Sequence, residues 1–579
     1  MKTQPATSVA SASFDGVKNW HDLDWARIQQ SVRKTQLKIA QATREGDWRR
    51  VKRLQRLLTH SFYGRCLAVR RVTENRGRKT PGVDGETWGT PQAKLHAVGR
   101  LSKKRGYRPR PLRRVWIPKP GKHEKRPLGI PTMLDRAMQA LYLQVLEPVV
   151  ESTSDPKSYG FRPDRSTADA MVELFHLLSP QTAPVWILEG DIKGFFDNIN
   201  HEWLCWNVPM DRTVLRKWLK AGVIDRRQLM ATEAGTPQGG IISPCLANAT
   251  LNGLETQLKR HLVNKLGTRN AKKSKVQCVR YADDFVVTAA SKELLEEEVK
   301  PWVEQFLSVR GVALSREKTQ ITHIHQGFDF LGWNFRKYVP KSPYRNAKLL
   351  IKPSKKNVSA FYRKVREIIK GSGALTQDAL IGQLNPVLKG WAQYHSTVVA
   401  KQTFSKLDSL IFWRLWRWAK RRHPRKSADW IRKKYFRSIG GQNWVFAYPY
   451  KNGKGERQFR RLYELAETAI VRHKRLSGEY QPYDATQELK WEALRVQRMQ
   501  HTLRYRGQIL SIFRRQKGLC ALCGHAISKE TGWHDHHVIR RVDGGTDTLR
   551  NRVLLHPNCH ALVHSRREKV TLRYGGQRC

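Results

Sequence analysis

Two adjacent carboxylates, Asp283 and Asp284, lie between two short apolar segments, residues 276–279 and 285–288. This pattern predicts two strands joined by a tight turn that carries both acids. Because neighbouring carboxylates repel each other, such a turn suits a site that binds a cation. Mg²⁺ is the usual cation of all-oxygen sites that also bind phosphates. A polar hairpin turn without any ligand is the alternative.

A third acid, Asp191, follows another apolar segment at residues 185–188 and precedes Phe195 and Phe196. If this segment forms a strand beside the predicted hairpin, Asp191 shares one cavity with the two adjacent acids. Three carboxylates from separate strands can hold two divalent ions about 3.5–4 Å apart, the geometry of in-line phosphoryl displacement. The three acids therefore favour metal-assisted phosphoryl transfer.

A glycine-rich loop at residues 235–240, with the sequence Gly-Thr-Pro-Gln-Gly-Gly, lies between these acids in the chain. Adjacent glycines allow the backbone to approach a flat ligand or a phosphate strand closely. An ordinary loop before a helix is the competing interpretation.

The C-terminal part is rich in cysteine and histidine. Two pairs, Cys520 with Cys523 and His556 with Cys559, have the spacing of a zinc knuckle. Further histidines stand at positions 536, 537, 560 and 564. The last two are four residues apart, so a helix would place them on one face, where they could hold a second metal ion.

The composition indicates a folded protein with a large polyanionic partner. Lys and Arg number 107 against 49 Asp and Glu, which gives a formal charge of +58, and hydrophobic residues make up 40% of the chain. Such a charge opposes compaction unless a polyanion neutralises it, and 19 Trp offer faces for stacking on bases. A membrane surface is the competing partner, but the basic residues are spread along the whole chain. We see no apolar run that could cross a membrane and no secretion signal.

The elements that must position these residues change along the chain. Residues 1–20 look like a flexible tail, and basic helices follow to about residue 75. Residues 105–335 mix short strands with helices, whereas residues 354–437 are helical and rich in Trp, Lys and Arg. A compact module follows from residue 507. The fold class expected is α+β multidomain.

Nine sequence blocks resemble those of reverse transcriptases encoded by group II introns, and they occur in the family's order. The blocks are residues 80–85, 114–120, 126–131, 159–163, 185–197, 235–240, 281–284, 317–319 and 330–333. The resemblance implies a right-hand polymerase with fingers and palm at 21–340 and a helical thumb and maturase domain X at 341–440. It also implies a DNA-binding linker at 441–505 and a small ββα-metal HNH endonuclease domain at 506–579.

For the polymerase, the resemblance implies the following roles. Asp191 and Asp283 would be the main Mg²⁺ ligands, with Asp284 in support. Lys119 and Arg126 would hold the incoming triphosphate, Phe196 would exclude a 2′-hydroxyl, and Gln238 would line the nucleotide pocket. Solvated charges at 119 and 126 and a plain core aromatic at 196 are the competing interpretations.

For the HNH domain, the resemblance implies that His537 is the general base and that His536, His560 and His564 hold the catalytic ion. Asn551 would orient the loop or the ion. Cys520, Cys523, His556 and Cys559 would bind a structural Zn²⁺, although many relatives carry Cys where His556 stands. A zinc site with His560 in place of His556 stays open, as does a purely structural zinc domain.

The function expected is a multifunctional intron-encoded protein: RNA-directed DNA polymerase, splicing cofactor and site-specific DNA endonuclease. These activities would act together in target-primed reverse transcription and intron mobility. Intron RNA, target DNA and deoxynucleoside triphosphates are the expected partners, without a membrane. The expected location is the bacterial cytoplasm, at the nucleoid when DNA is bound. The alternatives are an RNA-binding splicing factor with a decayed polymerase and a DNA-binding nuclease with an incidental polymerase fold.

Overall fold

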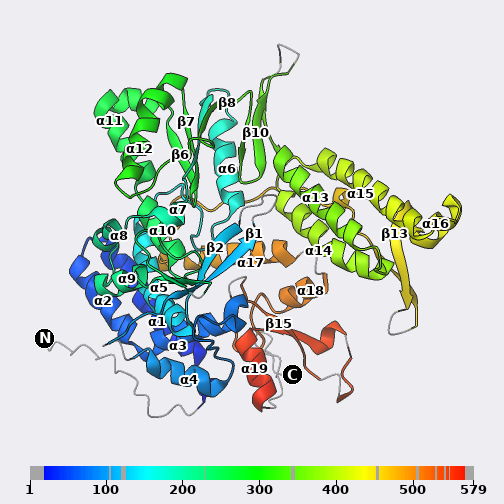
Figure 1. The fold of residues 1–579 in the computed structure, drawn as a ribbon, viewed down its shortest axis with the longest axis horizontal. Helices are drawn as coiled ribbons and strands as arrows, with labels where there is room; N and C mark the ends of the chain where they lie inside the picture. Colours follow the sequence, from blue (N-terminus) through cyan, green and yellow to red (C-terminus); the bar gives the residue numbers. More distant parts are fainter. Residues whose placement is uncertain are drawn as a thin grey trace.

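The computed structural model describes residues 19–102, 106–118, 125–226, 228–340, 344, 346–451, 455–503, 507–528, 531–539, 543–546 and 548–566. Most of the tail expected at 1–20 lies outside these ranges. Figure 1 shows mixed helices and strands on one side of the molecule and a helical arm on the other. Within the described ranges, no helix is both long enough and apolar enough to cross a bilayer.

A four-stranded antiparallel sheet carries the acids predicted from the sequence. Its order is β6-β7-β3-β8, with bounds β3 Trp186–Asp191, β6 Gln277–Tyr281, β7 Asp284–Ala289 and β8 Gln320–His323. Alternate residues of β7 enter two different cores: Phe285 and Val287 join one, and Val286 joins the other. Gly190 of β3 is required by packing, because a Cβ there would lie 2.2 Å from the Phe285 ring.

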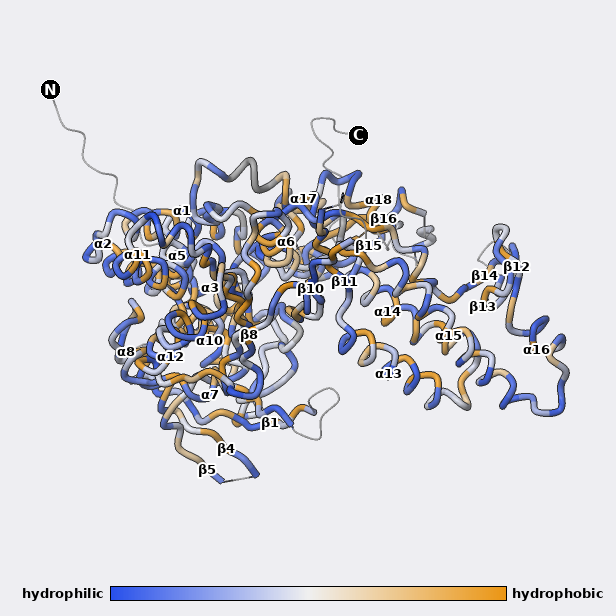
Figure 2. The backbone as a smooth tube through the Cα atoms, turned by 90° about the horizontal axis from the view of Figure 1, so that it is seen from above, coloured by the Kyte–Doolittle hydropathy of each residue, from blue (hydrophilic) through white to orange (hydrophobic). Residues whose placement is uncertain are grey.

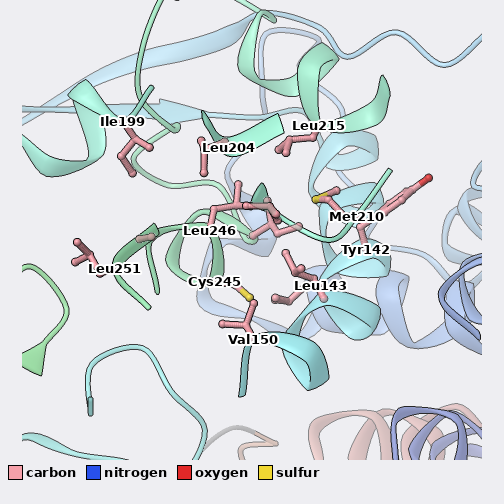
Figure 3. Packing of buried hydrophobic residues seen from close by; sticks show 14 of the residues in the cluster. Tyr142, Leu143, Val150, Ile199, Leu204, Met210, Leu215, Cys245, Leu246 and Leu251 are labelled. Atoms are coloured by element: carbon pink, nitrogen blue, oxygen red, sulfur yellow. The ribbon is translucent and has the colours of Figure 1, made fainter. Parts of the chain in front are cut away.

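Helices form the larger core with one face of this sheet. They are α1 Trp25–Arg44, α3 Phe62–Glu74, α4 Pro91–Arg100, α5 Met133–Thr153, α7 Phe195–Asn198, α8 His201–Asn207, α9 Arg212–Leu219, α10 Ser243–Leu251, α11 Leu254–Lys273 and α12 Lys300–Ser308. Helix α2 Trp48–His60 packs in a smaller cluster with α1 and α5, and α6 Thr167–Leu178 belongs to the core on the other face of the sheet. Helix α5 is buried along nearly its whole length. Figure 3 shows Tyr142 and Leu143 of α5 in the same cluster as Met210, Leu215 and Leu246.

A second four-stranded sheet forms the fingers beside this core. Its strands are β1 Leu112–Pro118, β2 Lys125–Ile130, β4 Val223–Asp225 and β5 Gln228–Met230, in the order β2-β1-β4-β5. The β1–β2 hairpin places Ile117 opposite Arg126. The loop that joins these two strands, which contains Lys119, lies outside the described residues.

A three-stranded sheet joins the palm to the helical arm. Its strands are β9 Phe328–Phe330, β10 Trp333–Tyr338 and β11 Lys348–Pro353. The arm contains α13 Lys355–Gly371, α14 Gln377–His395, α15 Lys401–Arg422 and α16 Ala428–Tyr435, and it ends in β12 Phe436–Ile439, β13 Gln442–Lys451 and β14 Arg457–Arg461. Figure 2 shows these strands at the far end of the arm. Trp418 is buried in the core of the arm, whereas Trp413 is 55% exposed.

The segment after β14 returns from the arm to the palm. Helix α17, Glu488–Leu503, places Arg495 2.6 Å from Asp164 and Arg498 2.6 Å from Asp169. The backbone N–H of Leu476 also donates to Asp169, over 2.9 Å. Several basic groups of the region expected to bind DNA are therefore paired within the protein. We call residues 465–503 the return segment.

The C-terminal module packs against both the return segment and the N-terminal helices. It contains α18 Gly507–Arg515, β15 His534–His537, β16 Arg552–Leu555 and α19 Pro557–Arg566. Its core includes Met499 and Leu503 of α17, so the packing unit begins before the boundary expected at residue 506. The Trp20 indole N–H donates to Asn558 Oδ1 over 3.3 Å. In Figure 1, α19 accordingly lies beside the N-terminal helices.

His395 should make the arm sensitive to acid. Its side chain is fully buried, Nε2 donates to Asn357 Oδ1 over 3.0 Å, and burial lowers the pKa of His395 to about 3. Between this pKa and the ordinary value near 6.5, only the unfolded state binds the proton, so stability is complete above about pH 6.5 and falls as the pH drops. We expect a loss of about 1.4 kcal/mol per pH unit, visible as faster hydrogen exchange in α14.

The variant His395→Gln keeps a hydrogen-bond donor but cannot titrate, so it should flatten this acid dependence. His176→Gln, at an exposed histidine, is the matched control and should leave it unchanged. Equal acid profiles for the wild type and His395→Gln would contradict the assignment.

Candidate active sites

The strand register brings the predicted polymerase acids together. Asp191 at the end of β3 pairs directly with Asp284 at the start of β7, and Tyr281 pairs with Asp284 across the hairpin. Ala282 occupies the turn with φ +58°, a left-handed conformation that non-glycine residues seldom adopt. Asp283 is the next residue of that turn. The conditional prediction that Asp191 lies beside the hairpin is therefore fulfilled.

Buried residues that the sequence did not single out hold this turn. The Arg280 guanidinium donates to the Ala282 carbonyl over 3.1 Å and to Asn248 Oδ1 over 3.2 Å. Asn248 in turn donates to the Gly160 carbonyl over 2.9 Å. Gly160 has no room for a side chain, because a Cβ would lie 2.2 Å from the Ala282 nitrogen. The hairpin is thus held by its own Arg280 and by two segments distant in sequence, which contain Asn248 and Gly160.

The electrostatics of the acid cluster suit a cation. Burial, followed by the charge of Asp191, raises the pKa of Asp283, and burial with the charges of Asp283 and Asp191 raises the pKa of Asp284 to about 7. The Lys318 ammonium lies 2.7 Å from Asp191 Oδ2, and this hydrogen bond raises the pKa of Lys318. Crowded oxygens that already attract an ammonium are a suitable ligand set for Mg²⁺. Lys318 is a site residue that sequence reasoning did not identify.

Hydrogen bonds connect the segments that contain the predicted nucleotide-pocket residues Phe196 and Gln238. The Gln238 amide donates to both carboxylate oxygens of Asp197 over 3.1 Å, and the backbone N–H of Thr236 donates to the Phe196 carbonyl over 2.6 Å. On the other side, the Gly129 N–H donates to the Gln238 carbonyl over 2.8 Å. The loop therefore links the palm to the fingers.

Of the two residues predicted to hold the triphosphate, the structure describes Arg126 but not Lys119. Arg126 lies on β2. Its positive charge acts to lower the pKa of Asp283 and so opposes the increase that burial causes. This places a guanidinium on the fingers within electrostatic reach of the acid cluster. Lys119 lies outside the described residues.

The four predicted zinc ligands gather at one point of the C-terminal module. One ligand atom each from Cys520, Cys523, His556 and Cys559 lies within 4.8 Å of the others. Hydrogen bonds from Cys523 and Cys559 lower the pKa of the Cys520 thiol, which favours a thiolate. Three cysteines and one histidine are a donor set that fits Zn²⁺. The structure groups His556 with the cysteines and leaves His560 out of this cluster.

A second cluster contains the histidines predicted to bind the nuclease ion. Nitrogens of His536, His560 and His564 lie within 4.8 Å of one another. Burial and the neighbouring histidines lower the pKa of His536, and they lower that of His560 to about 4. Neutral imidazoles are the form that ligates a metal ion. His534 also packs against His560, with ring centroids 4.9 Å apart, a neighbour that the alternation of β15 could have revealed.

The two remaining nuclease residues take different positions. His537 follows His536 on β15, so strand alternation directs its ring to the opposite side of the strand. Asn551 donates to the carbonyls of Ile539 and Thr546 and accepts the Ile539 N–H, all within 2.9 Å. Of the two roles considered for Asn551, this geometry supports orientation of the loop.

A strongly basic cavity lies between α13 and α15. It has a volume of about 600 Å³ and is lined by Arg366, Ile369, Lys370, Arg414, Arg417, Lys420 and Arg421. Arg414 donates to the Tyr362 hydroxyl over 3.1 Å. Six cations without an acid in the lining make this cavity a candidate site for phosphate groups.

Comparisons with known proteins match four parts of the chain. Residues 117–335 match the family model described as reverse transcriptase (RNA-dependent DNA polymerase), and residues 20–101 match the N-terminal domain of reverse transcriptase. Residues 358–436 match the group II intron maturase-specific domain. Residues 520–566 match the HNH endonuclease model.

Individual relatives agree with these matches. Protein YkfC of Escherichia coli is 36% identical over 319 residues, which cover 49% of this chain and 82% of YkfC. The group II intron-encoded protein LtrA of Lactococcus lactis is 32% identical over 331 residues, covering 47% of this chain and 54% of LtrA. Maturase-like protein 1 of Euglena gracilis is 25% identical, covering 67% of this chain and 78% of that protein.

The structure and the comparisons confirm the multidomain α+β fold and the family resemblance. The matched domains follow one another in the order reverse transcriptase, maturase and HNH endonuclease. The chain belongs to the group II intron-encoded proteins that combine these three domains.

Proposed function

We propose that this protein copies RNA into DNA, assists splicing of its intron RNA and cuts a DNA target whose end primes the copying. The observation that carries the polymerase part is the register of Asp191 opposite Asp284, with Asp283 in the adjoining turn. It supports two-metal nucleotidyl transfer, because carboxylates converge there from separate strands. Intact acids at all three positions also disfavour the alternative of a splicing factor with a decayed polymerase.

Bound Mg²⁺ would supply Lewis acidity for the transfer at Asp191, Asp283 and Asp284. Arg126, with Lys119, would hold the triphosphate. Lys318, whose ammonium lies against Asp191, would be a further cation for the phosphates of the incoming nucleotide. Phe196 would occupy the space of a ribose 2′-hydroxyl, and Gln238 would contact the nucleotide from the opposite side.

For splicing, the basic cavity between α13 and α15 is the proposed contact with intron RNA. Structured RNA exposes phosphates and 2′-hydroxyls, whereas its deep major groove hides the base edges. The cations that line this cavity therefore suit recognition of the RNA backbone. The cavity lies within the part of the chain that matches the maturase-specific domain.

For DNA cleavage, we propose that His536, His560 and His564 would hold a metal ion, which would supply Lewis acidity at the target phosphate, and that His537 would activate water. Zn²⁺ at the site formed by Cys520, Cys523, His556 and Cys559 would hold the small module together. With DNA and RNA as the proposed substrates, we expect the protein in the bacterial cytoplasm, at the nucleoid when it is bound to target DNA. Helix α17, within the linker expected to bind DNA, would position the nuclease.

Loss of one acid should abolish copying. Asp283→Asn should lower primer extension on an RNA template with Mg²⁺ by at least about 100-fold, because a metal ligand is lost. The rate of incorporation into a labelled DNA primer measures this effect. Glu304→Gln, at an exposed acid on α12, is the control and should retain the wild-type rate. Equal products from wild type and Asp283→Asn would refute the polymerase assignment.

The two chemical activities should separate by mutation. His537→Ala and His560→Ala should each abolish nicking of target DNA, because the base or a metal ligand is lost, while extension of a supplied primer continues. Product analysis on denaturing gels measures both. His60→Ala, at an exposed histidine on α2, should change neither. Folded variants that lose both activities would contradict the division into two centres.

Neutralising the arm cavity should weaken RNA binding through phosphate contacts. The triple variant Arg417→Gln, Lys420→Gln, Arg421→Gln should reduce the slope of log affinity against log salt concentration by about 2 to 3. Titrations of intron RNA at several salt concentrations measure this slope. Replacing Arg269, Lys272 and Lys273, exposed cations of α11, by Gln removes the same charge elsewhere. An equal fall in slope in both variants would show that only net charge matters.

A further inference from the structure

Phe161 combines two features that are individually unusual. Its φ is +58°, the left-handed region that a bulky aromatic residue seldom adopts. Its side chain is 48% exposed although it is a large hydrophobic group. A strained backbone beside a functional centre persists when surrounding contacts enforce it and is often part of the mechanism.

Both neighbours of Phe161 are fixed by buried contacts. Gly160 lies against the Ala282 nitrogen and accepts a hydrogen bond from Asn248 over 2.9 Å. The Arg162 guanidinium donates to Glu151 over 2.9–3.0 Å and to two backbone carbonyls over 2.9 Å. The backbone of Phe161 therefore cannot relax without disturbing the catalytic hairpin.

The constrained ring contacts Phe196. The centroids of Phe161 and Phe196 lie 6.0 Å apart with an interplanar angle of 74°, an edge-to-face contact. Phe195, which is buried, contacts Phe196 from another side at 5.6 Å and 65°. Phe196 itself belongs to α7, a helix of only four residues. The rings of Phe161 and Phe195 therefore contact the Phe196 ring from two sides, in addition to its packing against the larger core.

We propose that Phe161 is a positioning residue for sugar selection: its ring holds Phe196 in the orientation that excludes a 2′-hydroxyl. This inference rests on the proposed polymerase function and on Phe196 as the residue next to the sugar. One short segment then contacts both the acidic hairpin and the residue next to the sugar, because Gly160 packs against the turn and Phe161 packs against Phe196. Deoxynucleotide selection and metal binding are coupled through two consecutive residues.

The test compares incorporation of deoxy- and ribonucleotides in Mg²⁺ by the full-length protein. Phe161→Asn removes the ring but tolerates the left-handed backbone, whereas Phe161→Tyr keeps the ring. We expect the ratio of kcat/KM for deoxy- over ribonucleotide to fall about 3- to 10-fold in Phe161→Asn, the range that an edge-to-face pair supplies. Phe161→Tyr should keep the wild-type ratio. Trp206→Ala, at a 66% exposed aromatic, is the control.

A double-mutant cycle shows whether Phe161 acts through Phe196. In a Phe196→Ala background, Phe161→Asn should leave the ratio unchanged, because the ring to be held is gone. An unchanged ratio in the single Phe161→Asn variant overturns the proposal, as does an equal loss with both nucleotides. Failure of the wild type to extend any primer would instead overturn the proposed polymerase function.

Discussion

The repulsion among three carboxylates is the constraint on which the rest of the structure depends. Asp191, Asp283 and Asp284 are held close in a partly desolvated place, where each charge opposes the next. The three carboxylates stay close together only if the backbone is rigid enough to prevent them from moving apart. The strand pairing, the contact of Gly160 with the turn and the buried guanidinium of Arg280 supply this rigidity. The surrounding structure thus holds the three carboxylates in the arrangement that the proposed metal ions would require.

The sequence predicted the acids, the order of the domains and the two metal clusters, because each is carried by short local patterns. It did not predict partners that only the folded chain brings near. Lys318 is 127 positions from Asp191, and Asn248 is 32 positions from Arg280, the hairpin residue that it binds. His534 was also missed, although strand alternation places it beside His536. Local chemistry is thus readable from sequence, whereas the contacts that hold it depend on topology.

Two acids of this basic chain, Asp164 and Asp169, lie where the palm joins the return segment. Asp164 and Asp169 bind Arg495 and Arg498, which ties the return segment to the palm. Both arginines lie in the region that the family resemblance predicts to bind DNA, and both are paired with acids of the palm. The Asp169 side chain is fully buried, so removing its arginine partner would leave an unpaired buried charge, which is strongly destabilising. The helical arm contains the basic cavity, whose lining has no acid, so its positive field is directed outward.

The hydrogen bond between Trp20 and Asn558 joins residues 538 positions apart. On the ribosome, the N-terminal helices emerge first and the nuclease module emerges after the polymerase and the arm. The N-terminal surface on which the nuclease module docks is therefore synthesised long before the module. A chain whose translation stops early would therefore contain the polymerase domain without the nuclease module. The order of synthesis thus delays docking of the C-terminal module until the polymerase domain has been made.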